Sequence, residues 1–195
     1  MVKTKIAVLV SGGGTNLQAL LDAQAAGKIP HGEIVLVVSN KAGAYALTRA
    51  EMFGIKHTVI TGREFETRLQ QLLEENGIDM IVLAGFMKIL SGDFTAKWPD
   101  RILNIHPALI PSFCGEGYYG LRVHEEALRC GVKVTGATVH FVNEIPDGGR
   151  IIAQKAVDVL EGDTPEMLQR RVMEQAEWIL LPRAVEKVAE QLSTH

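Results

Sequence analysis

Short apolar runs alternate with amphipathic segments along the first half of the chain, and this alternation limits the fold more than any other feature. Runs rich in β-branched residues occupy 5–10, 33–39, 57–60, 79–85 and 102–105. Runs of this length that are apolar at consecutive positions are typical of strands buried on both faces of a sheet. The segments between them have helical periodicity, so the order predicts a parallel sheet with helices on both faces.

Capping residues mark the expected helix boundaries. Thr15 or Asn16 is predicted to cap the first helix with its side chain. Two further amphipathic helices, over 44–54 and 64–77, each end at a glycine, the residue that most easily closes a helix.

The last third of the chain departs from this alternation. A predicted helix over 121–131 is followed by strand-like segments at 132–142 and 150–159, joined by a short turn, which indicates an added antiparallel pair. Thr164 is expected to cap a long C-terminal helix that Pro182 should kink or break. The predicted fold is an α/β, Rossmann-like, mostly parallel sheet flanked by helices, with an antiparallel C-terminal strand pair.

Length and composition narrow the function classes. The 195 residues fit one domain, 1–195, and the net charge of −3 disfavours a nucleic-acid partner or an anionic membrane surface. No apolar run approaches the roughly 20 residues of a membrane span, and the N-terminus does not resemble a signal peptide. Cys114 and Cys130 lack metal-ligand spacing, so we expect no metal and reduced thiols in a cytoplasmic protein. A monomer and a homodimer both remain open.

A glycine-rich turn, SGGGTN at 11–16, joins the first predicted strand to the first helix. Glycines let the backbone approach an anion, and a helix N-terminus offers free N–H groups and the positive end of a dipole. The turn matches neither of the common nucleotide-binding glycine patterns, and the second strand ends in SNK, without an acidic residue for a ribose. These features favour a single phosphate over a dinucleotide; a tight turn without a ligand is the alternative.

The segment LNIH pairs an amide with an imidazole. Residues two apart in a strand point to the same side, so Leu103 and Ile105 should enter the core while Asn104 and His106 project together. They end the fifth predicted strand, at the edge where open α/β sheets bind ligands. An amide donor beside a titratable ring can stabilise an oxyanion and transfer a proton. A hydrogen-bonded structural histidine is the alternative.

The sequence IPDGG places Asp147 in a strong turn signal. If the turn folds over the sheet edge, Asp147 can face His106, raise the pKa of its imidazole and relay protons through water. A turn aspartate without chemistry is the alternative. On the residues alone, we expect His124 to be a solvated or packing helix residue, His140 a satisfied core or edge residue, and Glu177 a solvated helix charge.

Six motifs, taken in order, resemble those of the phosphoribosylglycinamide formyltransferases, the folate-dependent enzymes of purine biosynthesis: SGGGTNLQAL, SNK, LAGFMKIL, LNIHPALIPSF, GATVHFV and DGG. The resemblance runs from about residue 5 to about residue 190. It implies the formyltransferase fold, with a phosphate-binding half, about 1–100, and a catalytic and folate-binding half, about 101–195. It also implies 10-formyltetrahydrofolate as co-substrate and the amine of phosphoribosylglycinamide as acceptor.

The resemblance also implies roles for matching residues. The implied catalytic residues are Asn104, His106 and Asp147, and Glu177 would lie near the substrate amine or ribose. The residues implied to hold the substrate phosphate are Gly12, Gly13, Gly14, Thr15 and Asn16. The residues implied to contact folate are Arg63, Phe86, Met87, Lys88, Ile89, Leu90, Asn104, Val142, Asn143, Glu144, Ile145 and Pro146.

The implied reaction is direct attack of the amine on the formyl carbon, without a metal or a covalent enzyme intermediate. Asn104 would donate a hydrogen bond to the tetrahedral oxyanion, protonated His106 would add positive charge, and Asp147 would keep the ring charged. The chain departs from the commoner family pattern at Lys88, Arg150 and Trp178, which replace an arginine, a proline and a histidine, and in a longer loop at 114–122.

Three rival functions are set against this one. A hydrolase that releases formate from the same folate would need the three catalytic residues but no phosphate site, and an enzyme that formylates initiator tRNA would need an added basic domain. We expect neither, because 195 residues leave no room for a further domain. A non-catalytic nucleotide-binding module is disfavoured by SNK, and it would leave Asn104 and His106 without a role.

Overall fold

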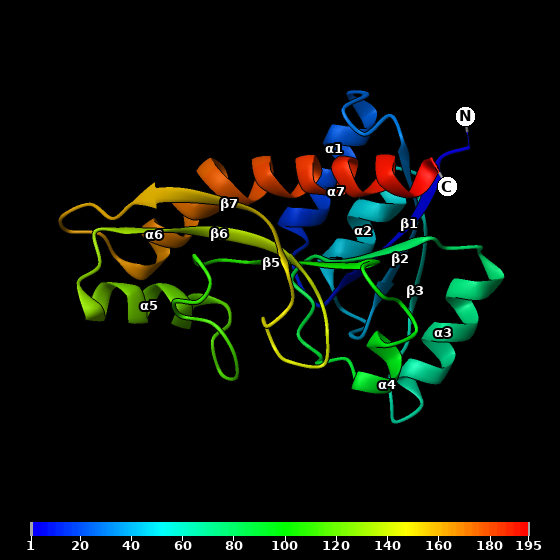
Figure 1. Cartoon of the computed structure of the whole chain (residues 1–195), viewed down its shortest axis with the longest axis horizontal. Coiled ribbons are helices and arrows are strands. Elements are labelled where there is room, and N and C mark those ends of the chain that lie inside the picture. The colour runs from blue at the N-terminus through cyan, green and yellow to red at the C-terminus, as the bar shows by residue number, and fades with distance from the viewer. Residues whose placement is uncertain (1, 195) are drawn as a thin grey trace.

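A computed structural model describes residues 2–194, and its centre is one sheet of seven strands. The strands are β1 (Thr4–Val10), β2 (Gly32–Ser39), β3 (Lys56–Val59), β4 (Met80–Leu83), β5 (Ile102–His106), β6 (Val134–Phe141) and β7 (Ile151–Asp158). Their order in space is β3-β2-β1-β4-β5-β6-β7 (Figure 1). The first five are parallel, whereas β6 is antiparallel to β5 and β7 is antiparallel to β6. The predicted mostly parallel sheet with antiparallel C-terminal strands is confirmed.

Helices cover both faces of this sheet. They are α1 (Thr15–Ala25), α2 (Tyr45–Met52), α3 (Phe65–Glu75), α4 (Gly92–Thr95), α5 (Leu121–Cys130), α6 (Pro165–Val172) and α7 (Trp178–Ser193). A single π turn, Met173–Glu177, joins α6 to α7. The sequence patterns predicted neither this π turn nor the short helix α4. Helix α7, red in Figure 1, lies along the sheet and packs against α1.

The core has two layers, one on each face of the sheet, and β1 shows why its sequence is apolar throughout. Ile6, Val8 and Val10 pack into the layer that α1, α2, α5, α6 and α7 cover. Ala7 and Leu9 point the other way, into the layer that α3 and α4 cover. All five side chains are fully buried, so a polar residue at any of these positions would lose its contact with water.

The strand order reverses between β1 and β4, which predicts a ligand crevice there. Chain connections leave these two neighbouring strands in opposite directions, since β2 and β3 continue on one side and β5 on the other. Ligands of open α/β sheets bind outside the carboxyl ends of the strands at such a point. The glycine-rich turn follows β1, the 84–90 segment follows β4, and His106 ends β5, so all three lie at this edge.

The predicted cap of α1 was wrong, and α7 is not broken at Pro182. The residue that caps α1 is Gly14, in the left-handed conformation with φ 72°, and neither Thr15 nor Asn16 caps the helix with its side chain. Helix α7 also continues through Pro182, and the irregular turn lies earlier, at Met173–Glu177. Prolines and π turns are the usual sites of helix distortion, and here the distortion falls in the turn before the proline. Among residues 2–194, no helix is long and apolar enough to cross a membrane.

Candidate active site

Strand β5 brings Asn104 and His106 to one side and its apolar residues to the other. Leu103 and Ile105 are buried in the larger core layer, as the alternation predicts. Asn104 is half-buried, and His106 is only 4% exposed at the end of the strand. The strand therefore fixes both polar side chains on rigid backbone at the carboxyl edge of the sheet.

The 145–149 turn folds back onto the end of β6 and carries Asp147 to His106. A Cβ on Gly149 would lie 1.7 Å from the carbonyl oxygen of Phe141, so only glycine allows this close approach. Asp147 adopts φ 55°, a conformation that aspartate tolerates better than most residues. Its Oδ2 atom lies 3.5 Å from Nδ1 of His106 and accepts a hydrogen bond of 2.8 Å from the N–H of Gly115. The two residues that the sequence could not bring together are therefore adjacent.

His140 is a fourth member of this cluster that the sequence patterns missed. It is the direct cross-strand partner of Asn104 in the β5–β6 pair. Its Nε2 atom lies 3.1 Å from Nδ2 of Asn104 and 3.5 Å from Oδ1 of Asp147, while Nδ1 lies 2.8 Å from the carbonyl oxygen of Phe141. The expectation of a satisfied core histidine is confirmed. Its link to Asn104 follows from the strand register, which residue alternation alone does not give.

Burial is the largest single influence on the pKa values of His106 and Asp147, but it decides the direction only at His106. It lowers the pKa of His106 below the usual 6.5, although the charge of Asp147 and a hydrogen bond of 2.8 Å to the carbonyl oxygen of Phe113 oppose the shift. The expected upward effect of Asp147 is therefore present but outweighed. Burial would raise the pKa of Asp147, but the contact with His140, the charge of His106 and the N–H of Gly115 together hold it below its usual value. At neutral pH we expect an ionised Asp147 beside a neutral His106.

His124 lies on α5 and is fully buried, so the expectation of a packing residue holds and that of a solvated one does not. Neither of its ring nitrogens has a hydrogen-bond partner among the residues that the structure describes. Burial, together with repulsion from His106, lowers the pKa of His124 to about 4. The ring is therefore neutral at physiological pH.

Glu177 is buried, which corrects the expectation of a solvated helix charge from the residues alone. Only 6% of the residue is exposed, because the π turn carries it inward against α1. Its Oε2 atom accepts a hydrogen bond of 2.6 Å from Nδ2 of Asn16. Burial raises the pKa of Glu177 to about 7, although the Asn16 bond opposes the shift. The side chain of Asn16 therefore bonds across the site through Nδ2 and makes no cap hydrogen bond to α1.

The glycine loop after β1 is linked to the segment after β4 through Ser11. The buried Ser11 hydroxyl donates to Oδ1 of Asn40 at 2.7 Å and accepts from the N–H of Met87 at 2.8 Å. Asn40 belongs to the SNK motif that follows β2. One hydroxyl therefore ties together the carboxyl ends of three strands, on both sides of the β1–β4 crevice.

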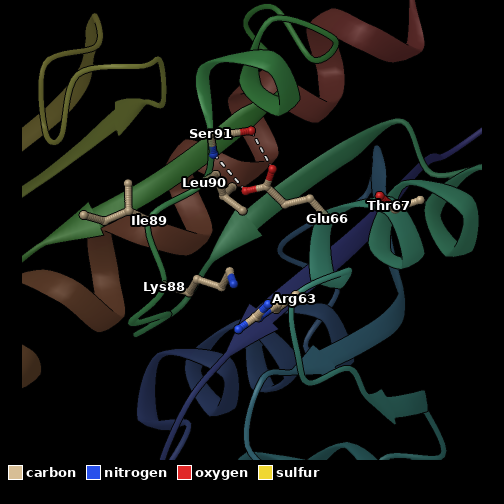
Figure 2. Close-up of a pocket in the computed structure, with 7 residues that line it drawn as sticks. All are labelled: Arg63, Glu66, Thr67, Lys88, Ile89, Leu90 and Ser91. Carbon is tan, nitrogen blue, oxygen red and sulfur yellow. Dashed lines mark hydrogen bonds between the residues drawn. The ribbon is translucent and has the colours of Figure 1, made fainter.

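A cavity of about 440 Å³ opens beside α3 and the segment after β4 (Figure 2). It is lined by Arg63, Glu66, Thr67, Lys88, Ile89, Leu90 and Ser91. The charged ends of Arg63 and Lys88 point into the same space, and Glu66 is held aside by hydrogen bonds from Ser91 (Figure 2). The cavity therefore presents two cations next to an apolar wall formed by Ile89 and Leu90.

Not all of the predicted folate residues line this cavity. Phe86 stacks on Phe65 with ring centroids 5.7 Å apart, and Met87 is largely exposed. The 142–146 segment leads from β6 into the Asp147 turn, and its side chains are partly or fully exposed. Asn104 belongs to the cluster with His106, His140 and Asp147. Of the predicted folate residues, Arg63, Lys88, Ile89 and Leu90 line the cavity, Asn104 lies in the cluster, and the others lie outside both.

The departures from the family pattern find structural partners in two of three cases. The ammonium group of Lys88 lies over the ring of Phe65 at 5.1 Å from its centroid. Arg150 lies over Phe141 at 4.6 Å and 3.5 Å from Asp100. Nε1 of Trp178 is buried with no hydrogen-bond partner in the described part of the chain. Within residues 2–194, no group of three or more His, Cys, Asp or Glu side chains could hold a metal ion.

Comparisons with known proteins agree with this geometry. The formyl transferase family model matches residues 4–185. The chain is 44% identical to phosphoribosylglycinamide formyltransferase of Haemophilus influenzae, covering 88% of this chain and 81% of that protein. It superposes on the crystal structure of glycinamide ribonucleotide transformylase 1 from Symbiobacterium toebii with a TM-score of 0.89 and 42% identity, covering 97% and 89% of the two chains.

A longer relative matches as well. The chain is 50% identical to the trifunctional purine biosynthetic protein adenosine-3 of Gallus gallus, and the match covers 96% of this chain. It spans only 18% of the length of that protein. The family model covers most of the chain, and the Haemophilus relative matches over most of both lengths. This chain therefore belongs to the formyl transferase family.

Proposed function

We propose that this chain transfers the formyl group of 10-formyltetrahydrofolate to the amine of 5-phosphoribosylglycinamide, a step of purine biosynthesis. The observation that carries the proposal is the contact of 3.5 Å between Asp147 and His106 at the carboxyl edge of the sheet. Membership of the formyl transferase family and the names of the relatives support the same reaction. Asn104, His106 and Asp147 are the proposed catalytic residues.

The acceptor substrate is proposed to bind along α1 and the π turn. Its phosphate would lie on the loop Gly12–Asn16, where helix N-terminal N–H groups favour an anion. Glu177 would contact the amine or the ribose hydroxyls, because its carboxyl group is held by Asn16 next to that loop. Since burial raises the pKa of Glu177 to about 7, the group can donate or accept a hydrogen bond near neutral pH.

The folate co-substrate is proposed to span the cavity and the cluster. The cavity supports the carboxylates of the glutamate tail, because Arg63 and Lys88 supply two cations there. Phe86 to Leu90 and the segment Val142–Pro146 would hold the rest of the folate, the latter around the pterin and largely through backbone groups. The catalytic cluster would then face the formyl group.

Proton transfer is proposed to begin with a neutral His106. The hydrogen bond to the carbonyl oxygen of Phe113 assigns the ring proton to Nε2, which leaves the lone pair of Nδ1 beside Asp147. As the amine attacks the formyl carbon, its proton passes to Nδ1, and Asp147 stabilises the imidazolium that forms. The same proton then moves to N10 of the folate as the carbon–nitrogen bond breaks, which returns His106 to its neutral form and releases tetrahydrofolate.

The oxyanion of the tetrahedral intermediate is proposed to be held by Asn104. One N–H of its amide is directed at Nε2 of His140, and this contact fixes the orientation of the group. The second N–H is then available to the oxyanion, next to the newly charged His106. A preorganised donor of this kind contributes about 3 kcal/mol to transition-state stabilisation.

The cytoplasm is the proposed compartment. Cys114 and Cys130 are both free thiols, which suit a reducing environment.

One assay tests the proposed function. The protein is mixed with 10-formyltetrahydrofolate, with and without phosphoribosylglycinamide, and both tetrahydrofolate and free formate are followed. We expect tetrahydrofolate to form only when the amine is present, with no free formate. Formate release without the amine would instead support a folate hydrolase and would contradict the proposal.

A further inference from the structure

Helix α2 contacts the glycine loop at two successive carbonyl groups. The backbone N–H of Ala46 donates to the carbonyl oxygen of Gly12 at 3.1 Å. The Nε–H of Arg49 donates to the carbonyl oxygen of Gly13 at 2.8 Å. The loop therefore has two of its carbonyl groups turned toward α2.

The planar trans geometry of the peptide bond determines where the N–H groups of the loop point. In such a peptide the carbonyl of one residue and the N–H of the next point in opposite directions. With the carbonyls of Gly12 and Gly13 held by α2, the N–H groups of Gly13 and Gly14 must point away from it. Gly14 in turn accepts the first bond of α1 from Gln18, which directs the N–H of Thr15 out of the helix end.

Three consecutive N–H groups thus turn to one side of the loop. None of the N–H groups of Gly13, Gly14 and Thr15 donates to another residue in the part of the chain described. Successive N–H groups that converge in this way form an anion-binding concavity. The nearby Asn16 has its Oδ1 atom buried without a hydrogen-bond partner among residues 2–194, and this oxygen can accept a hydrogen bond from a substrate hydroxyl but not from the phosphate.

Arg49 is itself held in place by two further contacts. Its Nη1 donates to Oε1 of Gln18 at 2.7 Å, and its guanidinium lies over the ring of Tyr45 at 5.0 Å from the centroid. The helix also approaches the loop closely, since a Cβ on Gly14 would lie 2.6 Å from the Cβ of Ala46. The guanidinium is thus a fixed support behind the loop rather than a mobile surface charge.

We propose that Arg49 is a positioning residue of the phosphate site: by holding the carbonyl of Gly13, it aims the N–H of Gly14 at the phosphate of the acceptor substrate. This inference rests on the proposed function. It assigns Arg49 an effect through peptide orientation, so the donor atom Nε matters more than the positive charge.

Three variants separate orientation from charge. Arg49→Met reaches as far as the position of Nε and removes both the donor and the charge. Arg49→Gln places an uncharged N–H donor as many bonds from the backbone as Nε, and Arg49→Lys keeps the charge without the fork. Arg68→Met, at an exposed position on α3, is the matched control.

The measurement is kcat/KM for phosphoribosylglycinamide and for the same nucleoside without its phosphate, at saturating 10-formyltetrahydrofolate. The ratio of the two values reports what the phosphate contributes. We expect Arg49→Met to lower this ratio at least tenfold while the KM for folate changes less than twofold. Arg49→Gln should recover most of the ratio, and Arg68→Met should match the wild type.

Other outcomes would overturn the inference. If Arg49→Met lowered kcat/KM equally for both acceptors, the role of Arg49 would be merely structural. A lowered melting temperature with an unchanged ratio of the two kcat/KM values would lead to the same conclusion. If Arg49→Lys had the wild-type ratio of kcat/KM values and Arg49→Gln did not recover it, the positive charge of Arg49 would be what matters. A wild-type protein that transfers no formyl group would instead contradict the proposed function, while binding of inorganic phosphate, weakened by Arg49→Met and restored by Arg49→Gln, would still test Arg49.

Discussion

Asn16 and Glu177 share a hydrogen bond of 2.6 Å although 161 residues separate them in the sequence. The contact joins the start of α1 to the π turn and buries an acid that would otherwise be solvated. The two ends of the domain thereby form one wall of the proposed acceptor site, so substrate binding and folding stability both depend on this pair.

Glu177→Gln should be more stable than the wild type at high pH. The folded-state pKa of Glu177 is raised from 4.5 to about 7, so the acid form stabilises the fold below about pH 4.5 and this contribution is lost as pH rises through 7. Glutamine stays neutral throughout. The advantage of the variant should grow from pH 5 to pH 8, up to about 3 kcal/mol.

Urea unfolding at four pH values between 5 and 8 measures this difference. The lowered pKa of His124, about 4, makes the free energy of unfolding change with pH in the opposite direction. This effect is the same in the wild type and in Glu177→Gln, so it cancels in the difference between them. A stability difference that does not change with pH would contradict a buried, protonatable Glu177.

Asp147→Asn should fold normally but lower kcat about 100-fold or more, since the imidazolium of His106 would lose its counter-charge. The Asn amide oxygen can still accept the N–H of Gly115. The charge of Asp147 raises the pKa of His106, so its removal should move the acidic limb of the kcat/KM profile to lower pH. Rate–pH profiles and a melting temperature check this, and near-normal turnover would remove Asp147 from the mechanism.

Ser11→Ala should weaken the binding of both substrates, because the Ser11 hydroxyl bonds to the loops on the two sides of the crevice. We expect the KM values for acceptor and folate both to rise and the unfolding free energy to fall by about 1 kcal/mol. Ser11→Thr keeps the hydroxyl and should restore both KM values. Steady-state kinetics with each substrate varied in turn provide the readout. A rise in only one KM would show that the two loops act independently.

Arg63→Ala and Lys88→Ala should each raise the KM for 10-formyltetrahydrofolate with little change in kcat. The reason is the loss of a cation from the cavity proposed for the glutamate tail. A folate analogue without glutamate provides the control, since its KM should not respond to either variant. Equal effects with and without the glutamate would place the tail elsewhere.

Local patterns predicted much of this molecule because they reflect local physics. Consecutive apolar residues identified β1 and β2, and the alternation in LNIH correctly separated Leu103 and Ile105 from Asn104 and His106. The same reasoning could not find His140, because its link to Asn104 depends on which residue of β6 lies opposite β5.

Other contacts lie beyond local patterns for similar reasons. The burial of Glu177 depends on the packing of α7 against α1, and the reach of Asp147 depends on how a nine-residue loop folds over β6. Capping preference also misplaced the cap of α1, since Gly14 is the N-cap and the Asn16 side chain donates to Glu177 instead. The motif order was more informative than any single pattern, since it carried the resemblance to the formyltransferases.

The π turn has a geometric consequence for the whole C-terminal helix. Leu168, Val172, Ala176, Leu180 and Ala184 are all buried and recur every fourth residue. In a regular α-helix such a ladder rotates by about 40° at each step and would wind off the sheet. The extra residue in the π turn Met173–Glu177 reverses part of this rotation. One added residue thus keeps a single apolar line facing the sheet from α6 to α7.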